Sequence, residues 1–199
     1  MTITGGEIKD RVLERLQMSG SVAYTDAFFY DILSKVQNVV NSSFELNVAT
    51  GTLNTIPSAF FYPLYWHLPN ALRVLDLSKS DVTIQPLKSW RELGQYAVAW
   101  RTVTTADSFS VWATIGRDML ILYPAKAAAD TVDVRYVECL TALTADASTF
   151  GLDEDYLGVV MDITELIFLT HQRELTAASK KLESIVKQFQ TLSDGRIQW

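Results

Sequence analysis

Hydrophobic positions near the start of the chain recur every three or four residues, the spacing of an amphipathic helix. Residues 7–18 and residues 25–44 both follow this spacing. Thr4 and Glu7 fit a capping box before the first segment. A Thr-Asp pair precedes the second, and either residue can cap it. The pattern predicts two helices, and the wide apolar face of the second must be buried against another element.

From residue 47 the pattern changes to short runs rich in β-branched and aromatic residues, separated by Gly, Pro and Asn. The segment 59–68 is especially aromatic and is interpreted as a strand, and residues 89–96 are predicted to form a short helix. Gly116-Arg117-Asp118 is typical of a hairpin turn between two strands. Extended runs are predicted at residues 48–56, 59–68, 72–75, 82–87, 111–115, 120–123 and 132–137.

Helical spacing returns near residue 153, where Asp153 can cap a helix and the acidic run 153–155 would offset the positive end of its dipole. The spacing leaves open whether one bent helix or two follow. The layout predicts an α+β fold, in which N- and C-terminal helices form a helical bundle with a small antiparallel β-sheet inserted. We expect one domain over residues 1–192, helical in 1–45 and 153–192 with a β-rich insertion in 46–140, followed by a flexible C-terminal tail at 193–199.

The composition narrows the function. A chain of 199 residues with 48% hydrophobic and 20% charged residues can bury a sizeable core. Its net charge of -6 comes without a basic stripe, which argues against a dedicated nucleic-acid binder. One cysteine permits no intrachain disulfide. The N-terminal residues lack the regions of a signal peptide, and no apolar stretch is long enough for a bilayer, so we expect a protein made in the cytoplasm that stays out of membranes.

Few residues suggest chemistry. Asp162 and Glu165 lie three apart on a predicted helix, but no second pair completes a di-metal cluster, so we expect solvated or interface acids. His67, in the aromatic segment, and His171, within reach of Glu174 by spacing, fit no zinc pattern. Cys139 is expected to be a small buried hydrophobe. Nucleotide-binding and hydrolase motifs are missing from the sequence, so we expect no enzyme, no cofactor and no metal.

Five tryptophans raise the question of base stacking, which needs basic neighbours. Near Trp90 and Trp100 the only arginines are Arg91 and Arg101. The prediction is therefore that these rings serve the core or subunit contacts. The tryptophans are Trp66, Trp90, Trp100, Trp112 and Trp199.

A longer pattern runs from residue 117 to residue 156. A strand leads to a Tyr-Pro turn, a second strand ends in Arg-Tyr-Val, and a linker leads to an acidic helix start. Earlier, Thr25-Asp26-Ala27 opens a helix that contains Ser34-Lys35-Val36-Gln37, an aromatic segment closes in Leu68-Pro69, and Trp100-Arg101-Thr102 precedes a hairpin. In order and spacing these segments resemble the head-to-tail adaptor proteins of tailed bacteriophages, also called connector or neck proteins.

The resemblance covers most of residues 25–192 and implies a structural virion protein of the neck. Such a protein would form a ring, expected to be a dodecamer, between the portal and the tail. Genome DNA would pass through its channel without sequence-specific binding. Its partners would be the portal protein and the tail or stopper proteins below. The C-terminal residues would order on docking, so the expected portal interface is Arg196, Ile197, Gln198 and Trp199.

An alternative stays open within the same class. The chain would then be a tail-completion or stopper protein elsewhere in the neck or tail, and sequence separates the two roles poorly.

Overall fold

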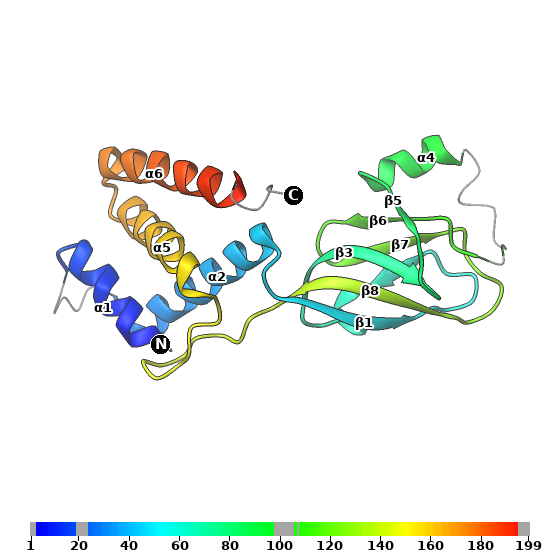
Figure 1. The fold of residues 1–199 in the computed structure, drawn as a ribbon, viewed down its shortest axis with the longest axis horizontal. Helices are drawn as coiled ribbons and strands as arrows, with labels where there is room; N and C mark the ends of the chain where they lie inside the picture. Colours follow the sequence, from blue (N-terminus) through cyan, green and yellow to red (C-terminus); the bar gives the residue numbers. More distant parts are fainter. Residues whose placement is uncertain (1–2, 19–23, 98–105, 107, 195–199) are drawn as a thin grey trace. The chain divides into compact units, whose positions relative to one another are not determined.

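The computed structural model describes residues 3–18, 24–97, 106 and 108–194. The chain divides into two compact units (Figure 1). The helical unit comprises Met1–Leu46 and Leu140–Trp199, and the β unit comprises Asn47–Cys139. The mixture of helices and strands confirms the α+β class. The prediction that both units act as one domain stays a prediction.

The helical unit is organised around one apolar helix. Helix α5 contacts each of the other three long helices (Figure 1). Buried residues such as Leu33, Val160 and Phe168 form a single hydrophobic cluster shared by these helices. Because α5 has neighbours on several sides, it is apolar around most of its circumference. The helices are α1 (Gly5–Arg15), α2 (Asp26–Phe44), α5 (Leu157–His171) and α6 (Leu175–Asp194), with a 3₁₀ turn η2 (Glu154–Tyr156) before α5.

Both predicted N-terminal caps are confirmed. The Thr4 N–H donates to Glu7 Oε2 at 2.9 Å, and the Glu7 N–H donates to Thr4 Oγ1 at 3.3 Å, which completes the capping box. Thr25 Oγ1 accepts from the Phe28 N–H at 3.3 Å and caps α2. Helix α2 ends at Phe44, as predicted, because the next residue adopts a left-handed backbone.

Two adjacent glycines at the start of α1 let a loop approach the helix closely. The Gly5 N–H donates to the Ser148 carbonyl at 2.8 Å, and the Gly6 N–H donates to the Asp146 carbonyl at 3.0 Å. A Cβ atom on Gly6 would lie 2.9 Å from the Asp146 Cβ, closer than real Cβ contacts. The first-turn N–H groups of α1 are therefore used by this loop, which joins the two halves of the helical unit.

The β unit contains two four-stranded sheets in place of the single antiparallel sheet predicted. Their orders are β1-β8-β3-β4 and β2-β7-β6-β5, and the β5–β6 pair is parallel. Side chains of both sheets, among them Leu53, Leu122 and Val134, share one buried cluster. The strands are β1 (Val48–Asn54), β2 (Phe61–Pro63), β3 (Ala71–Lys79), β4 (Val82–Thr83), β5 (Gln85–Pro86), β6 (Val111–Ile115), β7 (Met119–Tyr123) and β8 (Thr131–Glu138).

The predicted hairpin is confirmed, but its neighbour lies elsewhere. Strands β6 and β7 pair antiparallel across the turn at Gly116. Strand β8 follows β7 in sequence but belongs to the other sheet, where it pairs with β1 and β3. Strand periodicity marks which face of a strand is buried but not which strand lies beside it, so sequence could not separate the two sheets.

The aromatic segment predicted as a strand is only partly one. Strand β2 ends at Pro63, and a one-turn helix α3 (Leu64–His67) follows. The prediction that His67 lies in a strand is wrong. Residues 89–96 form the predicted helical segment as a 3₁₀ turn η1 (Trp90–Glu92) and a short helix α4 (Leu93–Tyr96).

The C-terminal helices also differ from the prediction in their limits. Helix α5 begins at Leu157, because residues 154–156 form the 3₁₀ turn, and Asp153 makes no side-chain capping bond. The chain then breaks into two helices, with Arg173 at φ 64° in the break. A left-handed residue that is not glycine leaves little trace in sequence. Helix α6 continues to Asp194, so the first two residues assigned to the tail are helical.

Candidate functional site

The candidate ligands from sequence do not converge in the structure. In the described ranges, no group of three His, Cys, Asp or Glu side chains is placed to hold a metal ion. His67 lies on α3, while His171 lies at the end of α5 with its Nδ1 3.4 Å from the Tyr24 hydroxyl. Cys139 is exposed, so its prediction as a buried hydrophobe is wrong. It follows the last residue of β8, where the strand leaves the sheet.

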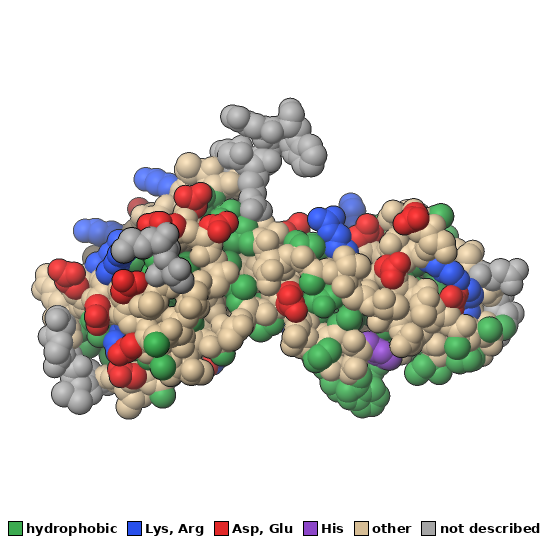
Figure 2. Space-filling model, turned by 60° about the horizontal axis from the view of Figure 1, so that its bottom comes forward, with side chains coloured by type: hydrophobic (Ala, Val, Ile, Leu, Met, Phe, Trp, Pro, Cys, Tyr) green, Lys and Arg blue, Asp and Glu red, His purple; other side chains and the backbone are tan. Residues whose placement is uncertain are grey.

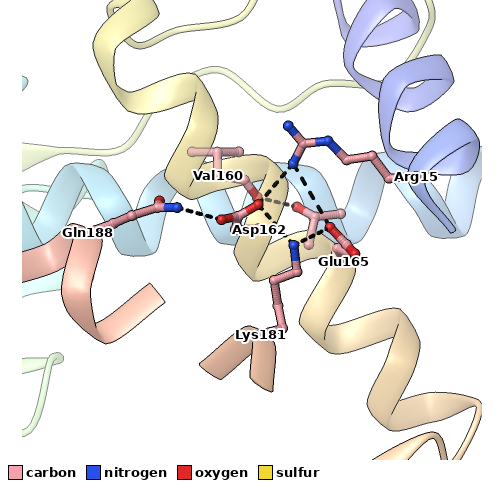
Figure 3. A network of polar contacts seen from close by, with 7 residues as sticks. Arg15, Val160, Asp162, Glu165, Lys181 and Gln188 are labelled. Carbon is pink, nitrogen blue, oxygen red and sulfur yellow. Dashed lines mark hydrogen bonds and ion pairs between the residues drawn. The ribbon is translucent and has the colours of Figure 1, made fainter. Parts of the chain in front are cut away.

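Asp162 and Glu165 instead form the centre of an ion-pair network (Figure 3). Asp162 Oδ1 lies 2.9 Å from Arg15 Nη1 and 3.3 Å from Lys181 Nζ. Asp162 Oδ2 accepts from Gln188 Nε2 at 2.6 Å. Glu165 Oε2 lies 2.8 Å from Lys181 Nζ, an ion pair without the alignment of a hydrogen bond, and 3.9 Å from Arg15 Nη1. The network contains two cations and two anions, so its formal charge is zero.

The network joins three helices. Of the two alternatives expected from the sequence, solvated or interface acids, the structure corrects the first, because both acids are buried between helices. Arg15 comes from α1, the two acids from α5, and Lys181 and Gln188 from α6. Both carboxylates are buried, with Asp162 6% and Glu165 9% exposed. Buried carboxylates are retained only where partners offset their desolvation, and here the partners supply that charge. We therefore assign the network to the packing of the helices and not to ligand binding.

Beside the network, the surface has a wide hollow of about 500 Å³. Its lining mixes charges, including Arg15, Glu165, Glu174, Lys180 and Lys181. Arg15 and Lys181 already pair with the buried acids. The hollow therefore lacks a concentrated charge of one sign with which to select a ligand.

A second polar cluster holds the 145–148 loop against the helices. Asp146 accepts from the Tyr30 hydroxyl and lies 2.8 Å from Lys9 Nζ. Lys9 Nζ also lies 3.3 Å from an Asp26 carboxylate oxygen. The Lys9 ammonium, followed by the Tyr30 hydroxyl, lowers the pKa of Asp146 below its ordinary value. Burial and the bond to Asp146 raise the pKa of Tyr30 to about 12.

This cluster predicts a pH-dependent contribution to stability. Because the folded-state pKa of Asp146 is lowered, its contribution is present above the ordinary pKa of 3.8 and is lost as pH falls through the lowered value. We expect Asp146→Asn to lower the urea midpoint of the helical transition at pH 7. The difference from the original chain should shrink progressively below about pH 4. Glu183→Gln, at an exposed acid in the middle of α6, is the control. A loss of stability for Asp146→Asn that is the same at pH 7 and at pH 3 would contradict the prediction.

Among the described residues of the helical unit, the most exposed large apolar side chains lie on α6. Leu175, Leu182 and Val186 are 66%, 51% and 49% exposed, respectively. Their spacing of seven and four residues places them on one face of the helix, which we call the α6 stripe. Ala178 and Ile185 lie on a neighbouring face and are buried. Helix α6 thus has one apolar face in the core and a second directed to solvent.

The β unit carries its own exposed aromatics. Tyr65 and Trp66, on α3, are 55% and 72% exposed, and hydrophobic side chains gather on one face of the β unit (Figure 2). Trp112 is buried, and its indole N–H donates to the Ile84 carbonyl at 3.0 Å. The prediction of core or contact roles therefore fits Trp112 as a core residue. Trp100 and Trp199 lie outside the described residues.

Comparison with known proteins finds a family model that matches most of the chain. A family model described as SU10 adaptor protein matches residues 3–192. The match spans both units of the chain. A search of curated proteins finds no match. Among the helices in the described part of the chain, none combines the length and apolarity of a membrane span.

Proposed function

This chain belongs to the SU10 adaptor protein family, a phage head-to-tail adaptor family, and on that premise we propose that it forms a ring between the portal and the tail of the virion. The family match over residues 3–192 is the observation that carries the proposal. A structural role is consistent with polar clusters whose charged groups are paired within the fold. In this proposal the four long helices act as a bundle that carries the ring contacts.

The α6 stripe supports assembly. A closed ring requires every copy to present two different surfaces that fit each other, and apolar residues at the centre of such contacts supply most of the affinity. The stripe offers three large apolar side chains on one helix face. We propose that it packs against the next copy in a ring, which we expect to be a dodecamer.

The charge of the chain suits a channel for DNA. Proteins that hold DNA neutralise its phosphates with Lys and Arg, and each such contact must be broken when DNA moves. This chain has a formal net charge of -6. In the proposed ring, genome DNA therefore passes through without sequence-specific binding, and the chain serves as a component of the virion neck.

The portal interface predicted from sequence, Arg196 to Trp199, lies outside the described residues and stays a proposal. Its basis is chemical, since residues 196–199 include an arginine and a tryptophan, and both residue types are enriched among interface anchors.

The deciding experiment combines the protein with the purified portal protein of the same phage. We expect electron microscopy to show a ring stacked on the portal. We also expect a chain ending at residue 194, which keeps all of α6, to keep its circular dichroism spectrum but to dock more weakly. Density in the intact neck that lies away from the portal would favour the stopper role. A failure to form any ring would reject the adaptor proposal.

A further inference from the structure

One edge of the β unit differs from the others. Strand β1 is the outermost strand of its sheet, and it has seven residues without proline or charge (Figure 1). The other outermost strands are β2, with three residues ending in Pro63, and β4 and β5, with two residues each. Proteins usually protect sheet edges by shortness, proline or charge, because an open edge invites pairing with another chain. Strand β1 has none of these protections.

The hydrogen bonds between β1 and β8 identify which backbone groups of β1 face away from the sheet. The Glu138 N–H donates to the Asn47 carbonyl, and the Thr55 N–H donates to the Asp130 carbonyl. The register between β1 and β8 is continuous across the seven residues between them. Hydrogen-bonding residues alternate in an antiparallel ladder, so the odd-numbered residues of β1 face β8. The N–H and C=O groups directed away from the sheet belong to Val48, Thr50, Thr52 and Asn54, and we call them the β1 edge groups.

The odd-numbered residues are tied into the core, which keeps the edge in place. Leu53 is fully buried. A Cβ atom on Gly51 would lie 2.7 Å from Leu68 Cδ2, so the side chains beneath the strand already fill that space. The strand is therefore held in an extended form while its outer edge is open, a preorganised template that costs an incoming segment less to engage.

The side chains around this edge define what could pair with it. Thr50, Thr52 and Asn54 are exposed and uncharged. Helix α3 lies against β1 and carries the exposed rings of Tyr65 and Trp66. A strand added to this edge would have side chains alternating between the α3 side and solvent. The added strand would therefore consist of uncharged residues, and its side chains on the α3 side would be apolar.

We propose that the β1 edge groups bind an extended, uncharged segment of another neck protein, which adds a strand to the sheet. The inference rests on the proposed ring. In a ring, neighbouring copies meet through two different surfaces, so β1 would need a long free edge on the next copy. The described edges other than β1 have at most three residues. Pairing of β1 with β1 of a second copy would close a two-fold dimer instead of continuing a ring. Because no described strand of a neighbouring copy fits this edge within a ring, we take a different protein as the occupant.

Residue-resolved hydrogen exchange tests the proposal. In the isolated protein the amides of Thr50 and Thr52 should exchange quickly, while those of Gly51 and Leu53, which bond to β8, should exchange slowly. We expect the fast set to become slow when the protein is bound to the purified portal protein or to the purified tail-side neck protein of the same phage.

A proline variant provides the matched binding test. Thr52→Pro removes an outward N–H that no β8 bond uses, and proline is tolerated at edge positions of this kind. We expect the complex that protects the edge to weaken about tenfold or more. Thr52→Ala keeps the N–H and should bind within about twofold of the original chain. Slow exchange of Gly51 and Leu53 in the proline variant verifies that β1 still pairs with β8.

Two results would overturn the proposal while leaving the ring intact. One is fast exchange of the edge amides in rings bound to the portal and in complete necks. The other is slow exchange in the isolated protein that disappears on dilution together with a dimer, which would make a second copy the occupant. Absence of any ring on the portal is a separate result, which rejects the proposed function and this inference with it.

Discussion

Replacement of Asp162 by alanine is expected to lower the free energy of unfolding of the helical unit by about 3 kcal/mol, near the lower end for breaking a buried ion pair. The variant leaves Arg15 and Lys181 with one carboxylate in place of two, and it removes the acceptor of Gln188. The effect stays near the lower end because the Arg15 side chain is 44% exposed and can recover hydration.

Urea denaturation followed by circular dichroism at 222 nm measures this effect, since that signal reports helices. The matched control is Asp31→Ala, which removes an exposed pair with Lys35 one turn along α2. Such a pair contributes about 0.3–0.5 kcal/mol. If both variants lost the same free energy of unfolding, the buried ion pairs of Asp162 would contribute no more to stability than the exposed pair of Asp31. Asp162→Asn tests the contribution of the charge alone. The amide has nearly the same shape and can still accept from Gln188, but it cannot form an ion pair with Lys181.

A second large effect is expected from charges on the α6 stripe. The double variant Leu182→Asp with Val186→Asp should prevent ring formation. Loss of two apolar anchors and burial of two carboxylates would cost roughly 2–4 kcal/mol per contact, on the order of a hundredfold in affinity. The fold should survive, since both positions are about half exposed and exposed substitutions usually change stability by about 0.5 kcal/mol or less.

Native mass spectrometry and electron microscopy with the portal protein measure the outcome. The control adds the same charge on another face of the same helix, through Ser184→Asp and Thr191→Asp, both at exposed positions. The control should assemble normally. Rings formed equally well by both double variants would exclude the stripe as a subunit contact. Rings lost in both would point to the net charge of α6 instead of its apolar face.

The sequence alone predicted the features that depend on local interactions. The capping box at Thr4, the cap at Thr25 and the span of α2 follow from short-range hydrogen bonds and a 3.6-residue period, and the structure confirms them. The β6–β7 hairpin was predictable because its turn and strands are adjacent in the chain. The adaptor family, too, was recognised from the order of such local segments, and the family match confirms it.

The tertiary structure decided everything that depends on partners distant in sequence. The spacing of Asp162 and Glu165 is local, but their burial depends on Arg15, 147 residues away from Asp162. The sequence therefore left solvated and interface acids as alternatives and did not predict the buried network. The division into two sheets depends on β8 leaving its sequence neighbour β7 and pairing with β1 and β3. That pairing with β8 also determines which backbone groups of β1 face away from the sheet. The periodicity of a segment shows which face of its helix or strand each residue occupies. Only the folded chain determines which other element lies opposite that face.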